Sequence, residues 1–169
     1  TRSIEEMAAA CIDLGYEYLG ICDHSRSAFY ANGLSEERIR RQHDEIDDLN
    51  EKYPDFKIFK GIESDILIDG SLDYPDKILE TFDLLVASVH SKLKMTEDEA
   101  TKRLEKVLNN SFTTSLGHPT GRLLLAREGF PVNMQFIIEL AQKNNVVIEI
   151  NANPHRLDLD WRHGKYAKE

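Results

Sequence analysis

The stretch Leu84-Leu85-Val86-Ala87-Ser88-Val89 decides the fold class of this sequence. A strand buried on one face alternates apolar and polar side chains, whereas a parallel strand covered on both faces reads as a nearly continuous apolar run. Similar short runs occur at residues 18–22, 57–62, 112–116 and 146–150. We therefore expect five strands of a parallel sheet.

Helix signals separate these runs. Ser3 and Glu6 form a capping-box pattern before the first helix, and Asn133 is placed to cap the last helix before the fifth strand. Periodic apolar residues and start signals predict helices near residues 4–14, 36–53, 75–82, 97–109 and 133–143, with a polar helix at the end of the chain. This alternation of helix and strand predicts an α/β fold with about five βα units.

Composition narrows the functional classes. The 169 residues fit one domain, residues 1–169, and 41% apolar with 30% charged residues is typical of a globular protein. No apolar run is long enough to span a bilayer, so we expect no membrane partner. Cys11 and Cys22 are isolated, which favours a reducing, cytoplasmic location. A net charge of -9 argues against a module that coats nucleic acid, but a local cluster of bound cations could still hold a phosphate.

Four candidate ligands each follow a different predicted strand: His24, Glu63, His90 and His118. The carboxyl ends of the strands in a parallel α/β barrel meet at one rim, where active sites are built. Any one histidine alone is more often structural, but four matching positions favour a shared metal site. Imidazole and carboxylate ligands suit zinc, manganese or iron, and one carboxylate can bridge two ions.

These residues lie in segments that resemble a known family. Successive motifs of the PHP (polymerase and histidinol phosphatase) superfamily are similar to residues 21–25, 61–67, 87–91, 117–122 and 149–154. The PHP domain at the C-terminus of bacterial family X DNA polymerases is similar in residues 65–73, 121–124 and 156–158. The resemblance implies a distorted TIM-like (β/α)7 barrel with three metal ions at its mouth.

The resemblance also implies roles. Glu63, His90 and His118 would be catalytic ligands, with Glu63 bridging and His24 serving a third ion. Asp23 and Asn151 would orient ligands or shape the mouth. Arg122 and Arg156 are candidates for substrate binding. Each could bind a phosphate or form a structural ion pair.

Two family motifs do not occur in this sequence. The family's first strand carries a His-x-His pair and its last strand an Asp-x-His pair, and neither pair is present. We expect a domain truncated at both ends that holds about one metal ion well, against three in an intact domain.

The expected activity is metal-dependent hydrolysis of a phosphate ester. The family X resemblance implies a 3′-5′ exonuclease that acts on a DNA 3′ end in DNA repair, with a polymerase domain upstream. One alternative is a small-molecule phosphatase of the histidinol-phosphatase type, and another is a non-catalytic platform of a polymerase.

Overall fold

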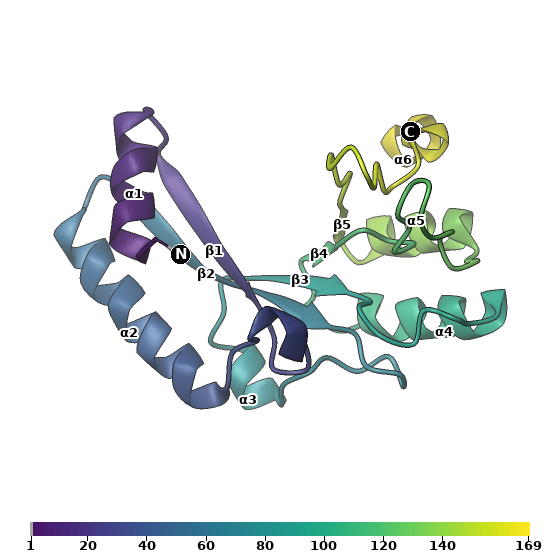
Figure 1. Cartoon of the computed structure of the whole chain (residues 1–169), viewed down its shortest axis with the longest axis horizontal. Coiled ribbons are helices and arrows are strands. Elements are labelled where there is room, and N and C mark those ends of the chain that lie inside the picture. The colour runs from purple at the N-terminus through teal and green to yellow at the C-terminus, as the bar shows by residue number, and fades with distance from the viewer. Residues whose placement is uncertain (1) are drawn as a thin grey trace.

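Five parallel strands form one sheet in the computed structural model, which describes residues 2–169 (Figure 1). The strands lie side by side in chain order, so each crossover joins neighbours. They are β1 (Tyr18–His24), β2 (Lys57–Asp65), β3 (Leu84–Ser88), β4 (Ser115–Leu116) and β5 (Val147–Ile148). The predicted α/β class is confirmed, and the arrangement is that of an incomplete TIM-like βα barrel.

The helices alternate with the strands as predicted. They are α1 (Ile4–Asp13), α2 (Glu36–Lys52), α3 (Asp76–Leu79), α4 (Glu97–Leu108), α5 (Met134–Lys143) and α6 (Gly164–Lys168), with short 3-10 turns η1 (Phe29–Ala31) and η2 (Trp161–His163). The capping box of Ser3 and Glu6 is formed at the start of α1. None of the helices in residues 2–169 is both long and apolar enough to cross a bilayer.

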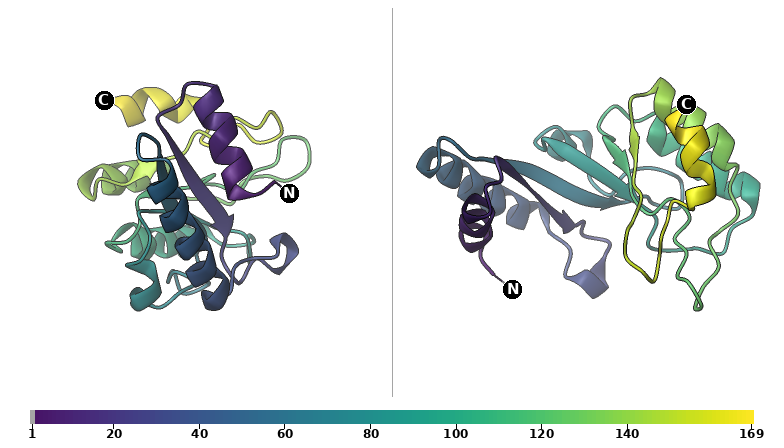
Figure 2. Two further views of the ribbon diagram at one scale, coloured as in Figure 1. Left: turned by 90° about the vertical axis from the view of Figure 1, so that its left-hand side faces the viewer. Right: turned by 90° about the horizontal axis from the view of Figure 1, so that it is seen from above.

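The core consists of two hydrophobic clusters along an elongated molecule (Figures 1 and 2). The smaller cluster lies where α1 and α2 cover the beginning of β1 and β2, and comprises Ile4, Ala8, Ile21, Ile46, Leu49, Phe56 and Ile58. The larger cluster joins the rest of the sheet to α3, α4 and α5, for example through Ile62, Leu104 and Ile137. Both clusters therefore lie on the helical side of the sheet and leave its other face free to carry polar residues.

Two strands are much shorter than predicted, whereas the other three differ from their predicted runs by one to three residues at the C-terminal end. The strand expected over residues 112–116 begins only at Ser115, because Asn110 accepts a hydrogen bond from the Phe112 N–H and holds a turn. The Leu85 N–H then donates to the hydroxyl oxygen of Thr114 at 2.8 Å instead of to a backbone carbonyl. The fifth strand, expected over residues 146–150, is reduced to Val147–Ile148.

Candidate metal centre

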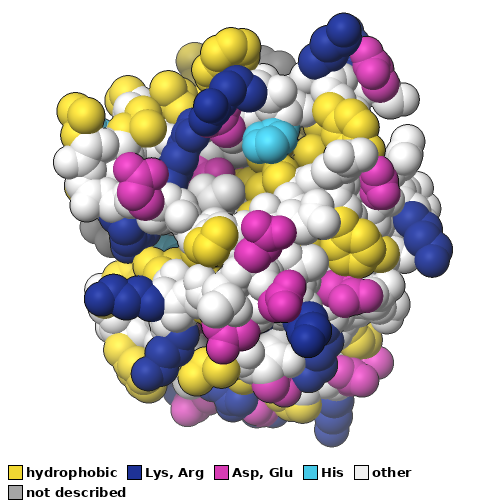
Figure 3. Space-filling view, turned by 90° about the vertical axis from the view of Figure 1, so that its right-hand side faces the viewer, with side chains coloured by type: hydrophobic (Ala, Val, Ile, Leu, Met, Phe, Trp, Pro, Cys, Tyr) yellow, Lys and Arg dark blue, Asp and Glu magenta, His cyan; other side chains and the backbone are white. Residues whose placement is uncertain are grey.

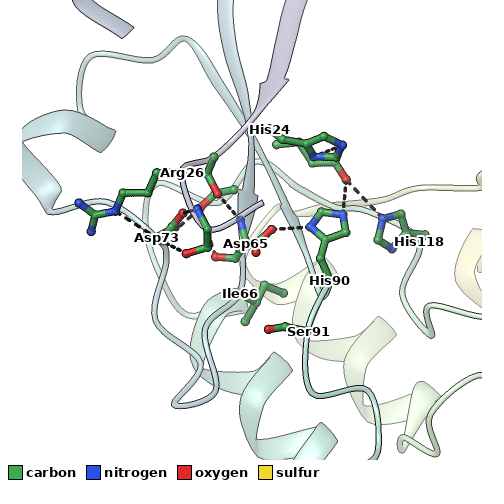
Figure 4. Close-up of polar contacts among 12 residues, drawn as sticks. His24, Arg26, Asp65, Ile66, Asp73, His90, Ser91 and His118 are labelled. Atoms are coloured by element: carbon green, nitrogen blue, oxygen red, sulfur yellow. Dashed lines mark hydrogen bonds and ion pairs between the residues drawn. The ribbon is translucent and has the colours of Figure 1, made fainter. Parts of the chain in front are cut away.

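Strand register and strand ends bring the four predicted ligands together. In the β1–β2 ladder His24 is the direct partner of Glu63. His90 and His118 each follow the end of their strand by two residues, after β3 and β4. Figure 4 shows the three histidine rings converging from three separate segments. All four residues therefore meet at the carboxyl rim of the sheet.

The two oxygens of Glu63 face different histidines. Oε1 lies 3.1 Å from His90 Nε2 and 3.3 Å from His118 Nε2. Oε2 lies 3.2 Å from His24 Nδ1, although the angle is not that of a hydrogen bond. The carboxylate thus lies between the His24 ring on one side and the His90 and His118 rings on the other, the arrangement that a bridging ligand requires.

The donor set fits a divalent transition-metal ion. Ligand atoms of His24, Glu63 and His90 all lie within 4.8 Å of one another. His118 lies outside this closest group but shares an oxygen of Glu63 with His90. Imidazole and carboxylate together suit zinc, manganese or iron, so these residues could hold a metal ion, and they leave its identity open.

A buried carboxylate fixes one of the rings. Asp65 is 3% exposed and forms a very short contact with His90 Nδ1, opposite the Nε2 that faces Glu63. Burial lowers the pKa of His90, but the hydrogen bonds that its ring donates to Asp65 and Glu63 outweigh it and raise the pKa to about 9. A carboxylate behind a histidine in this way orients the ring and strengthens it as a ligand.

The strand ends that carry these residues are anchored by Arg103 of α4. This side chain is 4% exposed. Its Nε donates to the carbonyl of Leu67 at 2.8 Å, its Nη1 to that of Ser91 at 3.1 Å, and its Nη2 to that of Ile66. One buried guanidinium therefore fixes the loops that follow Glu63 and precede α4.

The ligands line a cavity of about 410 Å³. Its lining comprises Cys22, His24, Tyr30, Glu63, Val86, His90, His118, Glu149, Asn151 and Arg156. Three buried nitrogen atoms of this lining have no hydrogen-bond partner in residues 2–169: His24 Nδ1, His118 Nδ1 and Arg156 Nη1. Buried polar atoms are nearly always paired, so this concentration marks a place where a ligand supplies the missing partners.

The two candidate phosphate clamps differ in their surroundings. Arg122 donates to Asp160 at 2.6 Å and to the backbone carbonyls of Arg156 and Leu157. Its guanidinium is thus engaged in holding a loop, the structural alternative left open above. Arg156 lies on that loop and lines the cavity, and its buried Nη1 has no hydrogen-bond partner in residues 2–169.

Some polar residues were misplaced or missed from the sequence. Asp23 accepts a hydrogen bond from Gln42 of α2 at 2.6 Å, so it lies on the helical side of β1, opposite His24. Asn151 does line the cavity. Beside it, Glu149 accepts the backbone N–H of His118 at 2.6 Å, a role that the sequence did not predict. Asp65 could have been found, because residues two apart on a strand share a face.

The remaining three histidines lie elsewhere. His43 is buried on α2, where its ring meets that of Phe82 edge-on at 4.9 Å. His155 and His163 do not line the cavity.

Comparison with known proteins gives two kinds of relative. Over 167 residues the chain is 48% identical to the DNA polymerase/3'-5' exonuclease PolX of Bacillus subtilis. This match spans 99% of this chain and 29% of the relative. A "Probable phosphatase" of Caldanaerobacter subterraneus is 30% identical over 107 residues, and one of Acetivibrio thermocellus is 26% identical over 155 residues.

These similarities cover different shares of the proteins. The two phosphatase matches span 61% and 88% of this chain, and 40% and 58% of the respective relatives. The chain therefore spans between about a third and three fifths of the relatives it matches. No family model matches it.

Proposed function

We propose that this chain belongs to the PHP superfamily and hydrolyses phosphodiesters, as the 3′-5′ exonuclease part of a bacterial family X DNA polymerase. The observation that carries the proposal is Glu63, whose two oxygens are divided among three histidines at the rim of the sheet. The high identity to PolX of Bacillus subtilis over nearly the whole chain supports the polymerase type.

The proposed roles follow from the geometry. His24, Glu63, His90 and His118 would hold one or more divalent ions. Such ions lower the pKa of a bound water and stabilise the charge that develops at phosphorus. Asp65 keeps the ring of His90 oriented, so that Nε2 faces the site.

Arg156 is proposed to bind the phosphate. Arg156 lines the cavity and its Nη1 has no partner in residues 2–169, and a guanidinium can donate two parallel hydrogen bonds to phosphate oxygens. Arg122 would contribute indirectly, because it holds the backbone carbonyl of Arg156 at 2.9 Å.

A second candidate is a phosphatase for small phosphomonoesters. The similarity to the "Probable phosphatase" relatives supports it. A cavity of about 410 Å³ also falls in the size range of small-molecule sites. Both candidates use the same metal-binding residues, so the substrate decides between them.

The test compares two substrates in the natural full-length protein. With Mn²⁺, we expect stepwise loss of nucleotides from the 3′ end of a labelled single strand, and much slower phosphate release from histidinol phosphate. The Glu63→Gln variant should lower kcat/KM for trimming about a hundredfold or more, because the bridging charge is lost. DNA synthesis by the proposed polymerase part should stay unchanged.

Glu37→Gln is the matched control, because Glu37 is an exposed α2 residue whose one ion pair in residues 2–169 is with Arg41. Trimming by this variant should equal that of the wild type. Full trimming by Glu63→Gln would exclude the proposed site, and faster release from histidinol phosphate would favour the phosphatase.

A further inference from the structure

Two neighbouring aromatic side chains project into solvent beside the metal centre. Phe29 is 88% exposed and Tyr30 is 72% exposed, both on the short turn η1. An aromatic side chain offers a large, flat apolar area on which another ring can stack. The position of each ring relative to the cavity decides whether it can contact a bound molecule.

Only one of the two belongs to the cavity. Tyr30 lines it, and its ring centroid lies 5.9 Å from that of His24 and 6.2 Å from that of His90. Phe29 is absent from the lining. A flat group stacked on Tyr30 would thus lie within the span of one nucleotide of the metal-binding residues.

The loop that carries Tyr30 is held by a buried carboxylate. Asp73, 2% exposed, accepts the Ser27 N–H at 2.7 Å and the Ser27 hydroxyl at 2.5 Å. Figure 4 shows Asp73 beside Arg26, close to Asp65. These bonds fix the loop before η1 on the scaffold of the site.

The Tyr74 hydroxyl joins the two ends of this loop. The Tyr74 hydroxyl accepts the Arg26 N–H at 3.0 Å and donates to the carbonyl of Leu34 at 2.6 Å. A Cβ added at Gly33 would lie 1.8 Å from the Ser25 carbonyl oxygen, so the loop closes only with glycine there. Tyr30 is therefore presented by a preformed loop, which reduces the entropy lost on binding.

Beside the carboxylates of Glu63 and Glu149, the cavity that Tyr30 lines carries one guanidinium that can bind a phosphate. Arg156 is the one Lys or Arg side chain of the cavity lining in residues 2–169, and it offers an unpaired donor. Tyr30 lines the same cavity and offers an uncharged ring face. A nucleotide carries both matching parts, a phosphate and a base with a π-face.

We propose that Tyr30 is the stacking platform for the nucleobase of the 3′-terminal nucleotide. This inference rests on the phosphoesterase function proposed above and names its substrate class as a nucleotide unit of a single strand. Because every base has a π-face, the subsite would bind bases with little sequence preference.

The experiment uses the natural full-length protein and an oligonucleotide with 2-aminopurine as its 3′-terminal base. A terminal phosphorothioate linkage slows hydrolysis during the measurement. Stacking quenches 2-aminopurine fluorescence, so wild type and Tyr30→Phe should both quench it on binding. Tyr30→Ala should remove the quenching and weaken binding roughly 5- to 100-fold.

Phe29→Ala is the matched control, because it deletes an equally exposed neighbouring ring outside the cavity. It should bind and quench as the wild type does. Equal quenching by Tyr30→Ala, no quenching by the wild type, or the same loss in both alanine variants would overturn the stacking role.

Hydrolysis of the same strand without phosphorothioate separates the two proposals. Quenching without any hydrolysis would leave the base subsite standing and reject the phosphoesterase. Hydrolysis without quenching would reject the subsite and retain the phosphoesterase.

Discussion

His90 lies between two carboxylates, with Asp65 at Nδ1 and Glu63 at Nε2. Although burial favours its neutral form, the carboxylates raise the pKa of His90 to about 9. Burial likewise raises the pKa of Glu63, but hydrogen bonds from His118 and His90 outweigh it and hold the pKa well below its usual range. In the metal-free protein at neutral pH, we therefore expect a charged His90 against an ionised Glu63.

This charge state predicts how metal binding depends on pH. A proton and a metal ion compete for His90 Nε2, so binding releases a proton below pH 9. The dissociation constant for Mn²⁺ should fall by up to about tenfold per pH unit between pH 7 and pH 9. Calorimetric titrations at several pH values measure it.

The same group predicts the opposite trend for the metal-free protein. The folded pKa of His90 lies above its ordinary value of 6.5, so its ion pairs stabilise the fold fully below about pH 6.5. Their contribution disappears as pH rises toward 9, and the melting temperature in EDTA should fall over that window. Asp65→Asn should shift both trends to lower pH; equal Mn²⁺ affinity at pH 7 and pH 9 in the wild type would contradict the assignment.

At the level of strands, β1 and β2 approach closely where Gly61 lies. A Cβ on Gly61 would be 2.6 Å from the backbone oxygen of Ile21 and 2.6 Å from Cys22 Sγ. The backbone of β1 has little room to move, because it is paired with β2 over seven residues. This contact sets the spacing of the two strands that carry His24 and Glu63.

Gly61→Ala should therefore destabilise the fold by about 1–3 kcal/mol, the usual result of overpacking a core. Chemical denaturation measures the loss. Gly20→Ala is the matched control on the neighbouring strand, because its Cβ would meet only Leu84 Cδ2 at 3.6 Å. Similar stability of both variants would show that the strands can separate freely.

Much of the fold could be predicted at this level. Continuous apolar runs indicated all five strands, and the cap residues Ser3 and Asn133 indicated where α1 and α5 begin. Strand ends were less predictable. The Leu85 N–H, for example, donates to the hydroxyl of Thr114, which is 29 residues away in the sequence. The pattern of the chain contains no sign of that contact.

The candidate site divides in the same way. Strand ends bring His24, Glu63, His90 and His118 to one rim, as the spacing predicted. The engagement of Arg122 with Asp160 depends on the path of a long loop, which no periodicity describes. Positions set by regular structure were predictable, and partners set by loops were not.

For the whole molecule, we predict about one tightly bound metal ion. Glu63, His90 and His118 supply one set of ligands around a shared oxygen, whereas His24 alone approaches the other. Titration of residues 1–169 with Mn²⁺ should give one tight site, and saturation at a hundred times the dissociation constant should add roughly 2.7 kcal/mol of stability. Three tight sites would contradict the prediction.

The surface charge agrees with local recognition of substrate. The net charge is -9, and on the face in Figure 3 basic and acidic side chains are interspersed. A surface of this kind has no broad positive field for a nucleic-acid backbone. We therefore expect affinity for DNA to come from the cavity and from other parts of the natural protein.

The pairing of His24 with Glu63 has a mechanical consequence. In residues 2–169, β1 is joined to the sheet along β2 alone, and these two side chains are its last pair. A metal ion bound by both His24 and Glu63 would cross-link the edge strand to its neighbour at the point where the ladder ends. Metal binding and the local stability of β1 would then be thermodynamically coupled. Backbone amides of β1 would therefore exchange with solvent more slowly in the metal-bound protein.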